Sequence, residues 1–225
     1  MKQLYLECNM GAAGDMLNAA FFDICTEKQQ EGYLETMNRL SDHIRVTMEK
    51  VTNSSICGNH MHVLVQTAEG AREEGHDHRV IAHADIAHRD HANVEHIHTH
   101  ENHTHEEHTH AHGDHDHAHG EHHHEHHSMA DIHHLVDSFP VSEQVKADVK
   151  AVYRELAAAE SKAHGKPVEE IHFHEVGSMD AVADITGACL LLEMLHPDEI
   201  IVSPVNVGSG HVHTAHGVLP VPAPA

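Results

Sequence analysis

The sequence predicts one α/β domain, or an α+β domain, interrupted by a histidine-rich insert. Two regions alternate apolar and polar residues as strands do, a third repeats apolar residues at helical spacing, and a segment of biased composition lies between them. With 225 residues, the chain leaves room for one hydrophobic core outside the insert. We expect residues 1–70 and 129–225 to form the two halves of the domain, ending in a proline-rich tail, and residues 71–128 to form the insert.

The N-terminal half begins with a predicted strand, a turn and a helix. Leu4 and Leu6 alternate with Tyr5 in a strand over residues 3–8, and a glycine-containing turn over residues 9–14 follows it. The expected helix has an apolar side formed by Met16, Leu17, Ala20, Phe21 and Ile24.

A short second helix is expected over residues 33–40. Apolar residues then alternate with polar ones over residues 44–48 and again over residues 61–65. This period of two predicts a pair of half-buried strands.

The composition changes at about Gly70, where histidine becomes the dominant residue. Between His76 and His134 lie 23 of the 33 histidines and no Phe, Tyr or Trp. Such a segment buries too little apolar surface to offset roughly 1–2 kcal/mol of backbone entropy per ordered residue. We therefore expect it to be disordered without metal, with transient helix over residues 80–92.

The C-terminal half carries the strongest helix signal, over residues 145–163, with a glycine and then a proline after it. A strand over residues 171–175, a helix over 179–195 and a strand over 200–202 are expected next, and residues 208–225 read as loop. The apolar stripe of the first helix is Val145, Val149, Val152, Leu156, Ala159 and Ala163.

Net charge and cysteine spacing limit the classes of protein to which the chain can belong. The formal net charge is -23 with histidine neutral, which makes nucleic acid a poor partner. The four cysteines form no C-x-x-C pair, as is typical of reduced thiols, and no signal peptide or membrane-spanning run is present in the sequence. We expect a cytoplasmic protein without a membrane partner.

The insert offers many imidazoles to one ion in alternative combinations. Neutral imidazole suits nickel, copper, zinc and cobalt, so spacing leaves the metal open, and a solvated linker that meets metal only by chance is the alternative. The candidate metal ligands, two of them from the strand over 171–175, are His96, His98, His100, His103, His105, His108, His110, His112, His115, His117, His119, His122, His123, His124, His126, His127, His172 and His174.

A second constellation follows the strand over residues 171–175. His172 and His174 project on one face of that strand, and Asp180 and Asp184 share one face of the next helix near its start. Together with Glu175 they could bind a cation or place a general base near a substrate. We take His174, Glu175, Asp180 and Asp184 as candidate catalytic residues. In the alternative, the carboxylates only favour the helix N-terminus and the histidines pack.

The turn G-A-A-G-D gives the candidate cofactor-binding residues Gly11, Gly14 and Asp15. Glycines allow close backbone approach, and a helix N-terminus favours anions. The turn lacks the Gly-Lys-Ser/Thr of a P-loop, and Asp15 would repel an anion unless a cation intervened. Capping of the helix by Asp15 is the alternative.

Four stretches resemble the LarC family, the nickel insertion proteins for pyridinium-3,5-bisthiocarboxylic acid mononucleotide. They are LYLECNMGAAGDM, ADIHHLVDSFPVSEQVKADVKAVYRELAAAESKAHG, HFHEVGSMDAVADITGA and SPVNVGSGHVHTAHGVLPVPAPA, and they cover nearly all of the chain outside the insert. The resemblance implies that the metal is Ni(II) and that the chain serves maturation of the nickel-pincer cofactor of lactate racemase. It leaves a non-catalytic nickel store or metallochaperone as the alternative.

The resemblance also implies a lyase-class cyclometallase that places Ni(II) between two thiocarboxylates as a ring proton leaves. CTP, with Mn or Mg, would act through a C-terminal domain that the family carries beyond the stretch matching residues 222–225. By that resemblance the chain is the N-terminal lobe, expected to collect nickel without completing insertion alone. The implied partners are the mononucleotide, the C-terminal LarC domain, the lactate racemase apoprotein and further copies of the chain.

Overall fold

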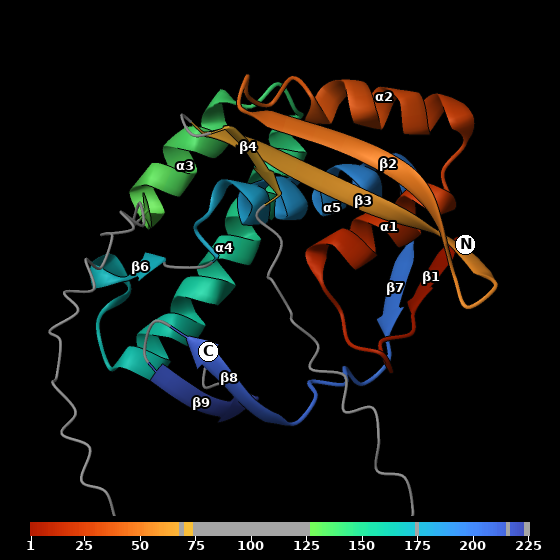
Figure 1. Ribbon diagram of the computed structural model, residues 1–225. Helices are drawn as coiled ribbons and strands as arrows, with labels where there is room; N and C mark the ends of the chain where they lie inside the picture. Colours follow the sequence, from red (N-terminus) through yellow and green to blue (C-terminus); the bar gives the residue numbers. More distant parts are fainter. Residues whose placement is uncertain (68–69, 74–126, 174–175, 215–216, 223–225) are drawn as a thin grey trace, which may run out of the picture. The chain divides into compact units, whose positions relative to one another are not determined.

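A computed structural model of the chain describes residues 1–67, 70–73, 127–173, 176–214 and 217–222 (Figure 1). All of them belong to a unit made of Met1–Gly75 and His124–Ala225, in which residues from both halves of the chain share one core. The mixture of helices and strands confirms the α/β class. The expected disorder of the insert and the transient helix over residues 80–92 lie outside the described residues.

An antiparallel sheet comprises β2 (Ile44–Asn53), β3 (Ile56–Thr67) and β4 (Gly70–Glu73), in the order β2-β3-β4. Ile44 pairs with Val65, and both side chains are buried, whereas Arg45 between the buried Ile44 and Val46 is exposed. One face of the sheet therefore contributes to the core and the other meets solvent. The two strands predicted from alternation are confirmed, and they extend further than predicted.

Three helices pack on this sheet: α1 (Gly14–Asp23), α2 (Glu27–Met37) and α5 (Met179–Leu195). α5 lies at the centre, in contact with α1, α2, β3 and α4 (Glu143–His164) (Figure 1). Its residues Val182, Ala183 and Leu191 are fully buried. A helix that is apolar almost all round is expected in such a position.

The remaining helices have clear sequence signals at their ends. In α3 (Met129–Ser138), Ser128 and Asp131 form a capping box. In α4, Ser142 accepts a hydrogen bond from the Val145 amide, and Gly165 ends the helix in the left-handed conformation. A short 3-10 turn, η1 (Val168–Glu170), follows α4.

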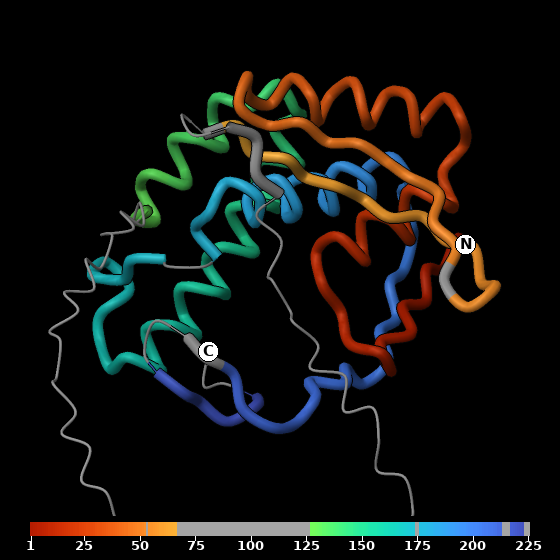
Figure 2. The backbone as a smooth tube through the Cα atoms, viewed as in Figure 1, coloured from red at the N-terminus to blue at the C-terminus, as the bar shows by residue number. Residues whose placement is uncertain are grey.

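Three two-stranded sheets complete the described chain. The N-terminal strand β1 (Gln3–Leu6) runs parallel to β7 (Glu199–Val202), so the start of the chain lies beside the segment that follows α5 (Figure 2). β5 (His127–Ser128) pairs with β6 (His172–Phe173), and β8 (Gly210–Thr214) forms a hairpin with β9 (Gly217–Val221).

Two predicted helix faces are only partly correct. In α1 the predicted Phe21 is buried, but Met16 is exposed, as is Ile24 just after the helix, and the other buried residues are Asn18, Ala19 and Phe22. The face rotates because α1 contacts both α5 and β3, and because a hydrogen-bonded asparagine belongs to its buried side. In α4 the predicted Val145 and Val149 are buried, but the buried side continues through Tyr153 and Ala157, whereas Val152, Ala159 and Ala163 are exposed.

The expectation that residues 208–225 form a loop is also wrong, since β8 and β9 occupy residues 210–214 and 217–221. The glycines and prolines of this stretch suggested loop, but Gly217 adopts a positive φ of 99° at the turn of the hairpin. A proline is tolerated in an edge strand, and Pro220 lies in β9 opposite His211.

Other boundaries differ in extent. α2 begins at Glu27 rather than near Tyr33, because Thr26 and Gln29 form a capping box. β6 contains only His172 and Phe173 of the strand predicted over residues 171–175, and residues 174–175 lie outside the described chain. Among the described residues, no helix combines the length and apolarity needed to cross a bilayer.

Candidate functional site

The glycine turn after β1 packs against the loop that follows β7. The amide of Cys8 donates to Ser203 Oγ at 2.8 Å, and the amide of Asn206 donates to the Cys8 carbonyl at 3.0 Å. Gly11 has a φ of +91°, a conformation that suits glycine, and a Cβ there would lie 3.4 Å from the Asn206 carbonyl oxygen. The two segments, nearly 200 residues apart in sequence, thus form one structural feature.

At the start of α1, the backbone makes direct contact with Asp184 on α5. A Cβ added to Gly14 would lie 2.5 Å from Asp184 Oδ2, so only glycine permits this approach. Asn18, one turn further along α1, donates from Nδ2 to the Asp184 carbonyl oxygen at 3.0 Å and to its carboxylate Oδ1 at 3.3 Å. The N-terminal parts of α1 and α5 are therefore held together around one carboxylate.

Asn18 is itself fixed from the other side. Its Oδ1 accepts a hydrogen bond from the Tyr33 hydroxyl at 3.4 Å, and both residues are almost fully buried. A Cβ at Gly187 would lie within 2.7 Å of both polar groups. A buried asparagine that is bonded to a tyrosine and a carboxylate has a defined orientation, which positions Asp184 in turn.

Two further carboxylates surround Asp184. Its partial burial and the negative charges of Asp15 and Asp180 raise its pKa from 3.8 to about 7, and the hydrogen bond from Asn18 opposes this shift. Like charges that share a site cannot all be ionised cheaply. Asp184 therefore exchanges a proton near neutral pH, as a general base or acid requires.

Asp180 belongs to the start of α5. The Ser178 hydroxyl donates a short hydrogen bond to Asp180 Oδ1, which holds this carboxylate in the first turn of the helix. The Tyr153 hydroxyl donates to the Val176 carbonyl at 2.9 Å just before the helix begins. Burial, together with the charge of Asp180, raises the pKa of Tyr153, so this tyrosine stays neutral.

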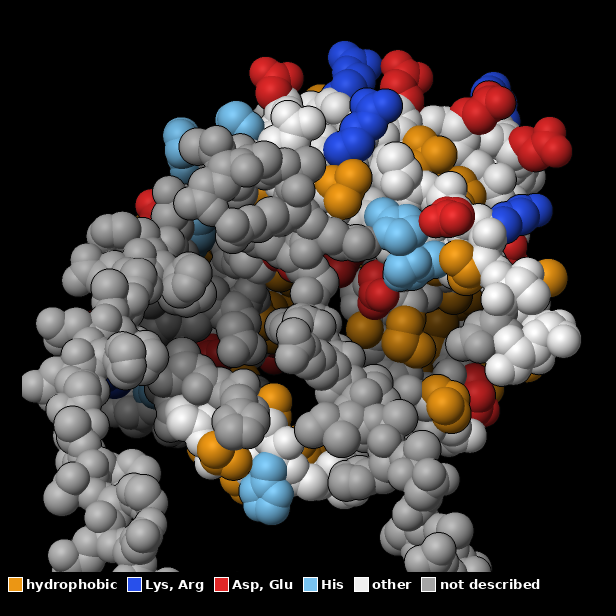
Figure 3. Space-filling model, viewed as in Figure 1, with side chains coloured by type: hydrophobic (Ala, Val, Ile, Leu, Met, Phe, Trp, Pro, Cys, Tyr) orange, Lys and Arg blue, Asp and Glu red, His pale blue; other side chains and the backbone are white. Residues whose placement is uncertain are grey.

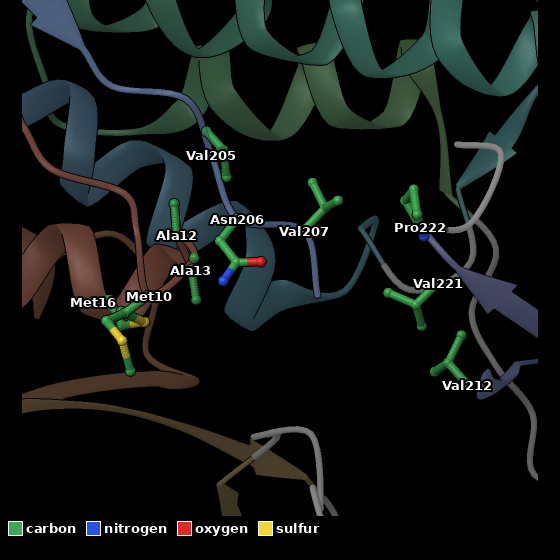
Figure 4. A pocket seen from close by; sticks show the side chains of 11 residues that line it. Met10, Ala12, Ala13, Met16, Val205, Asn206, Val207, Val212, Val221 and Pro222 are labelled. Atoms are coloured by element: carbon green, nitrogen blue, oxygen red, sulfur yellow. The ribbon is translucent and has the colours of Figure 1, made fainter. Parts of the chain in front are cut away.

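An open cavity of about 670 Å³ lies at the glycine turn that precedes α1. Its walls are residues 10–13 and Met16 from the glycine turn and α1, residues 205–207 from the opposing loop, and Val212, Val221 and Pro222 from the hairpin. The lining side chains face an open space from these segments (Figure 4). Hydrophobic and acidic side chains lie at the hollow on this face of the molecule (Figure 3).

The cavity is mostly apolar, with Asn206 as the one polar side chain among the residues that line it. Its volume falls in the usual range for small-molecule sites, which are apolar with a few polar groups. Gly14 and Asp15 lie between two of its lining residues, Ala13 and Met16, in the sequence. Gly14 links the cavity wall to the carboxylate cluster, because it follows the lining residue Ala13 and contacts Asp184.

The structure thus brings together residues that the sequence placed in two separate motifs. Gly14 and Asp15 lie near Asp184, as does Asp180, whereas Gly11 contacts Asn206 and lines the cavity. Asp15 does not cap α1, because Ala13 is the N-cap and no side chain caps it, so the capping alternative is wrong. Asp15 instead lies in the first turn, where its Oδ1 accepts from the Met16 amide at 2.8 Å.

The two candidate histidine ligands in the described part of the chain, His127 and His172, are not part of this cluster. His172 is exposed on β6, where it pairs with Ser128, and His127 pairs with Phe173. Both histidines lie close enough to Asp131 to lower the pKa of its carboxyl, after the larger effect of its hydrogen bonds with Ser128. His174, Glu175 and the candidate ligands from His96 to His126 lie outside the described residues.

Within the described part of the chain, no group of three or more His, Cys, Asp or Glu side chains is arranged to hold a metal ion. The four cysteines are free, in agreement with their unpaired spacing. Sequence reasoning missed Asn18, Tyr33 and Asn206. An asparagine inside the apolar part of a helix was the available signal for Asn18, because buried polar side chains need partners.

Comparison with known proteins gives a consistent result. The model of the family described as "Nickel insertion protein" matches residues 4–225. The pyridinium-3,5-bisthiocarboxylic acid mononucleotide nickel insertion proteins of Akkermansia muciniphila, Lactiplantibacillus plantarum and Clostridium kluyveri are 45%, 36% and 32% identical to the chain. Each alignment covers all of this chain and 44%, 45% and 46% of the respective relative.

The chain therefore spans less than half the length of these relatives. No solved structure matches it. Because the family model covers almost every residue, including the glycine turn, Asp180 and Asp184, the chain belongs to the nickel insertion protein family.

Proposed function

We propose that the chain binds Ni(II) and takes part in its insertion into pyridinium-3,5-bisthiocarboxylic acid mononucleotide, the molecule named in its relatives. The observation that carries this proposal is the raised pKa of Asp184, about 7, in a side chain that contacts Gly14, next to the turn that lines an apolar cavity. The cavity supplies walls for the flat pyridinium ring, and the three carboxylates favour the positive charges of the ring and of Ni(II).

The chemistry needs a base. When nickel bonds to a ring carbon, the carbon–hydrogen bond breaks, its electron pair forms the nickel–carbon bond, and the proton must be accepted. A carboxylate whose pKa lies near the working pH accepts such a proton efficiently. We assign this role to Asp184, with Asp15 and Asp180 as the charges that keep its pKa high and Asn18 as the positioning residue.

The histidine-rich insert, taken as residues 71–128, is proposed to collect the nickel. The soft sulfur donors are supplied by the two thiocarboxylates of the substrate, so the protein needs no cysteine thiolate at the site. Imidazoles that bind in many combinations can surrender an ion to such donors. His172, His174 and Glu175 are proposed to take part in this transfer.

We further propose that the reaction is a lyase-class cyclometallation driven by CTP with Mn or Mg. The chain would associate with the remainder of the LarC polypeptide and with further copies of itself, and the product would be delivered to lactate racemase. The free cysteines support a reducing compartment, and we propose the cytoplasm.

The test is single-turnover insertion at saturating nickel, with this chain combined with the remaining part of a relative, CTP and the mononucleotide, and the product followed by its absorbance and mass. Asp184→Asn is expected to lower the rate by about 10²-fold or more, because the base is lost while the shape is kept. Asp42→Asn, an exposed aspartate elsewhere, is the matched control and should match the parent. An unchanged rate in Asp184→Asn would show that Asp184 is not the base.

A non-catalytic nickel store remains the second candidate, favoured by the 23 histidines clustered in one segment. A store predicts nickel binding by the chain and no dependence of cofactor formation on Asp184. The single-turnover experiment therefore also separates the two functions.

A further inference from the structure

Strand β7 carries three consecutive apolar residues that are all exposed. Ile200, Ile201 and Val202 retain 45%, 42% and 52% of their accessible surface. Successive residues of a strand point to opposite faces, so both faces of β7 are apolar and open. Continuous β-branched runs of this kind are typical of parallel strands that are covered on both faces.

In the described chain, however, β7 lies at an edge. It pairs in parallel with β1 on one side, and no other described strand continues this sheet. Tyr5, which is the register partner of Ile201, is also exposed. An open, apolar edge strand is a template on which another strand can pair.

The apolar surface continues from β7 into the cavity. Val205 and Val207 are about half exposed and line the cavity together with Met10 and Met16, which are exposed as well. Monomeric proteins rarely leave large connected apolar patches uncovered, and such patches mark interaction sites. We define this β7 surface as Ile200, Ile201, Val202, Val205 and Val207.

We infer that the β7 surface binds an extended, apolar segment of the polypeptide that the relatives carry outside the part matched by this chain. More than half of each relative is such polypeptide, since the matched share is 44–46%. Val221 and Pro222 line the same cavity as Val205 and Val207, so the β7 surface and the end of the hairpin border one hollow.

Charge disfavours a second copy of this chain as the occupant. Each copy has a formal net charge of -23, and Glu199 and the exposed Asp198 lie at the start of β7. Like charges brought together across an interface oppose association. A strand added by the remaining polypeptide would cover β7 and close one wall of the cavity, which excludes water from the carboxylates beside it.

This inference rests on the proposed function, because its partner is the rest of an insertion protein, but it is tested without nickel, CTP or mononucleotide. The remaining part of the Akkermansia muciniphila relative is produced alone, its folding is checked by circular dichroism, and its binding to this chain is measured by calorimetry. Ile201→Asp and Val205→Asp are expected to weaken binding by about tenfold or more, because each would bury a charge.

Ile56→Asp is the matched control, since Ile56 is 75% exposed in β3, outside the β7 surface, and it should bind as the parent does. Hydrogen exchange should also show slower exchange of the amides of residues 199–207 on binding. Equal binding by all three variants would overturn the inference. So would sedimentation showing that the chain alone forms dimers that Ile201→Asp disrupts, because the occupant would then be a second copy.

If the remaining part does not fold alone, hydrogen exchange is measured in the full-length relative, with and without an aspartate at the position aligned with Ile201. The amides aligned with residues 199–207 are expected to exchange more slowly in the unsubstituted relative than in this chain. Equal exchange would contradict the inference. Loss of insertion in Asp184→Asn with normal binding would leave this inference intact, whereas loss of binding in Ile201→Asp leaves the assignment of the base untouched.

Discussion

The histidine-rich segment and the junction of α1 with α5 supply their chemical groups in opposite ways. Residues 76–123 contain 18 of the 33 histidines, so ligands are abundant whichever of them meets the ion. The junction has three carboxylates, and specific contacts, such as that of Gly14 with Asp184, fix their positions. The difference teaches that metal capacity can follow from composition, whereas proton transfer depends on placement.

The first prediction separates the two regions directly. Deletion of residues 76–123 should lower the number of nickel ions bound per chain several-fold, because most imidazoles are removed, while insertion at saturating nickel stays unchanged. Equilibrium dialysis measures the first quantity and the single-turnover assay the second. His122→Ala, the control, should change neither, since neighbouring histidines replace it. Loss of insertion at saturating nickel after the deletion would contradict this division of roles.

The second prediction concerns the pH dependence of stability. The unfolded chain releases the Asp184 proton near pH 4, whereas the folded chain holds it up to about pH 7. Between these values the folded state binds more protons, so the contribution of Asp184 to stability falls as pH rises. The free energy of unfolding of Asp184→Asn, relative to that of the parent, should therefore rise by on the order of 2–4 kcal/mol from pH 4 to pH 8.

Urea unfolding of metal-free protein at both pH values measures this gain. The parent and the variant share all other ionisable groups, so the difference between the two isolates Asp184. Asp42→Asn, an exposed aspartate, should show no such gain. If the difference in stability between Asp184→Asn and the parent is the same at pH 4 and pH 8, the carboxyl is not held protonated by its surroundings.

The smallest expected effect tests placement alone. Gly14→Ala adds a Cβ 2.5 Å from Asp184 Oδ2 and should destabilise the fold by about 1–3 kcal/mol. Gly32→Ala in α2, where nothing lies within 4 Å, should stabilise it by up to about 1 kcal/mol. Thermal unfolding compares the two. Similar effects of both substitutions would mean that α1 and α5 are not in close contact at Gly14.

Much of the fold follows from local sequence signals. The alternation in β2 and β3, the glycine that ends α4, and the extent of α5 were all predicted, because each depends on neighbours in sequence. The buried faces of α1 and α4 and the hairpin of β8 with β9 were not. A helix face depends on how many partners surround it, and an edge hairpin rich in glycine and proline has no apolar pattern.

The candidate site shows the same division. Asp15, Asp180 and Asp184 were singled out by their positions at helix starts, and Gly11 and Gly14 by the turn they imply. That these belong to one site was not predicted, nor was the role of Asn18. Nearly 170 residues separate Asn18 from Asp184, and local patterns carry no information about which helix N-termini meet.

The sequence by itself determined the class of fold, the abundance of imidazoles and the family, because these depend on composition and on long ordered motifs. Only the tertiary structure decided that Asp184 has two acidic neighbours, that the glycine turn lines a cavity, and that β7 is left at an edge of its sheet among the described strands. The physical reason is that a pKa and a binding surface arise from burial and distance between groups that are far apart in the chain.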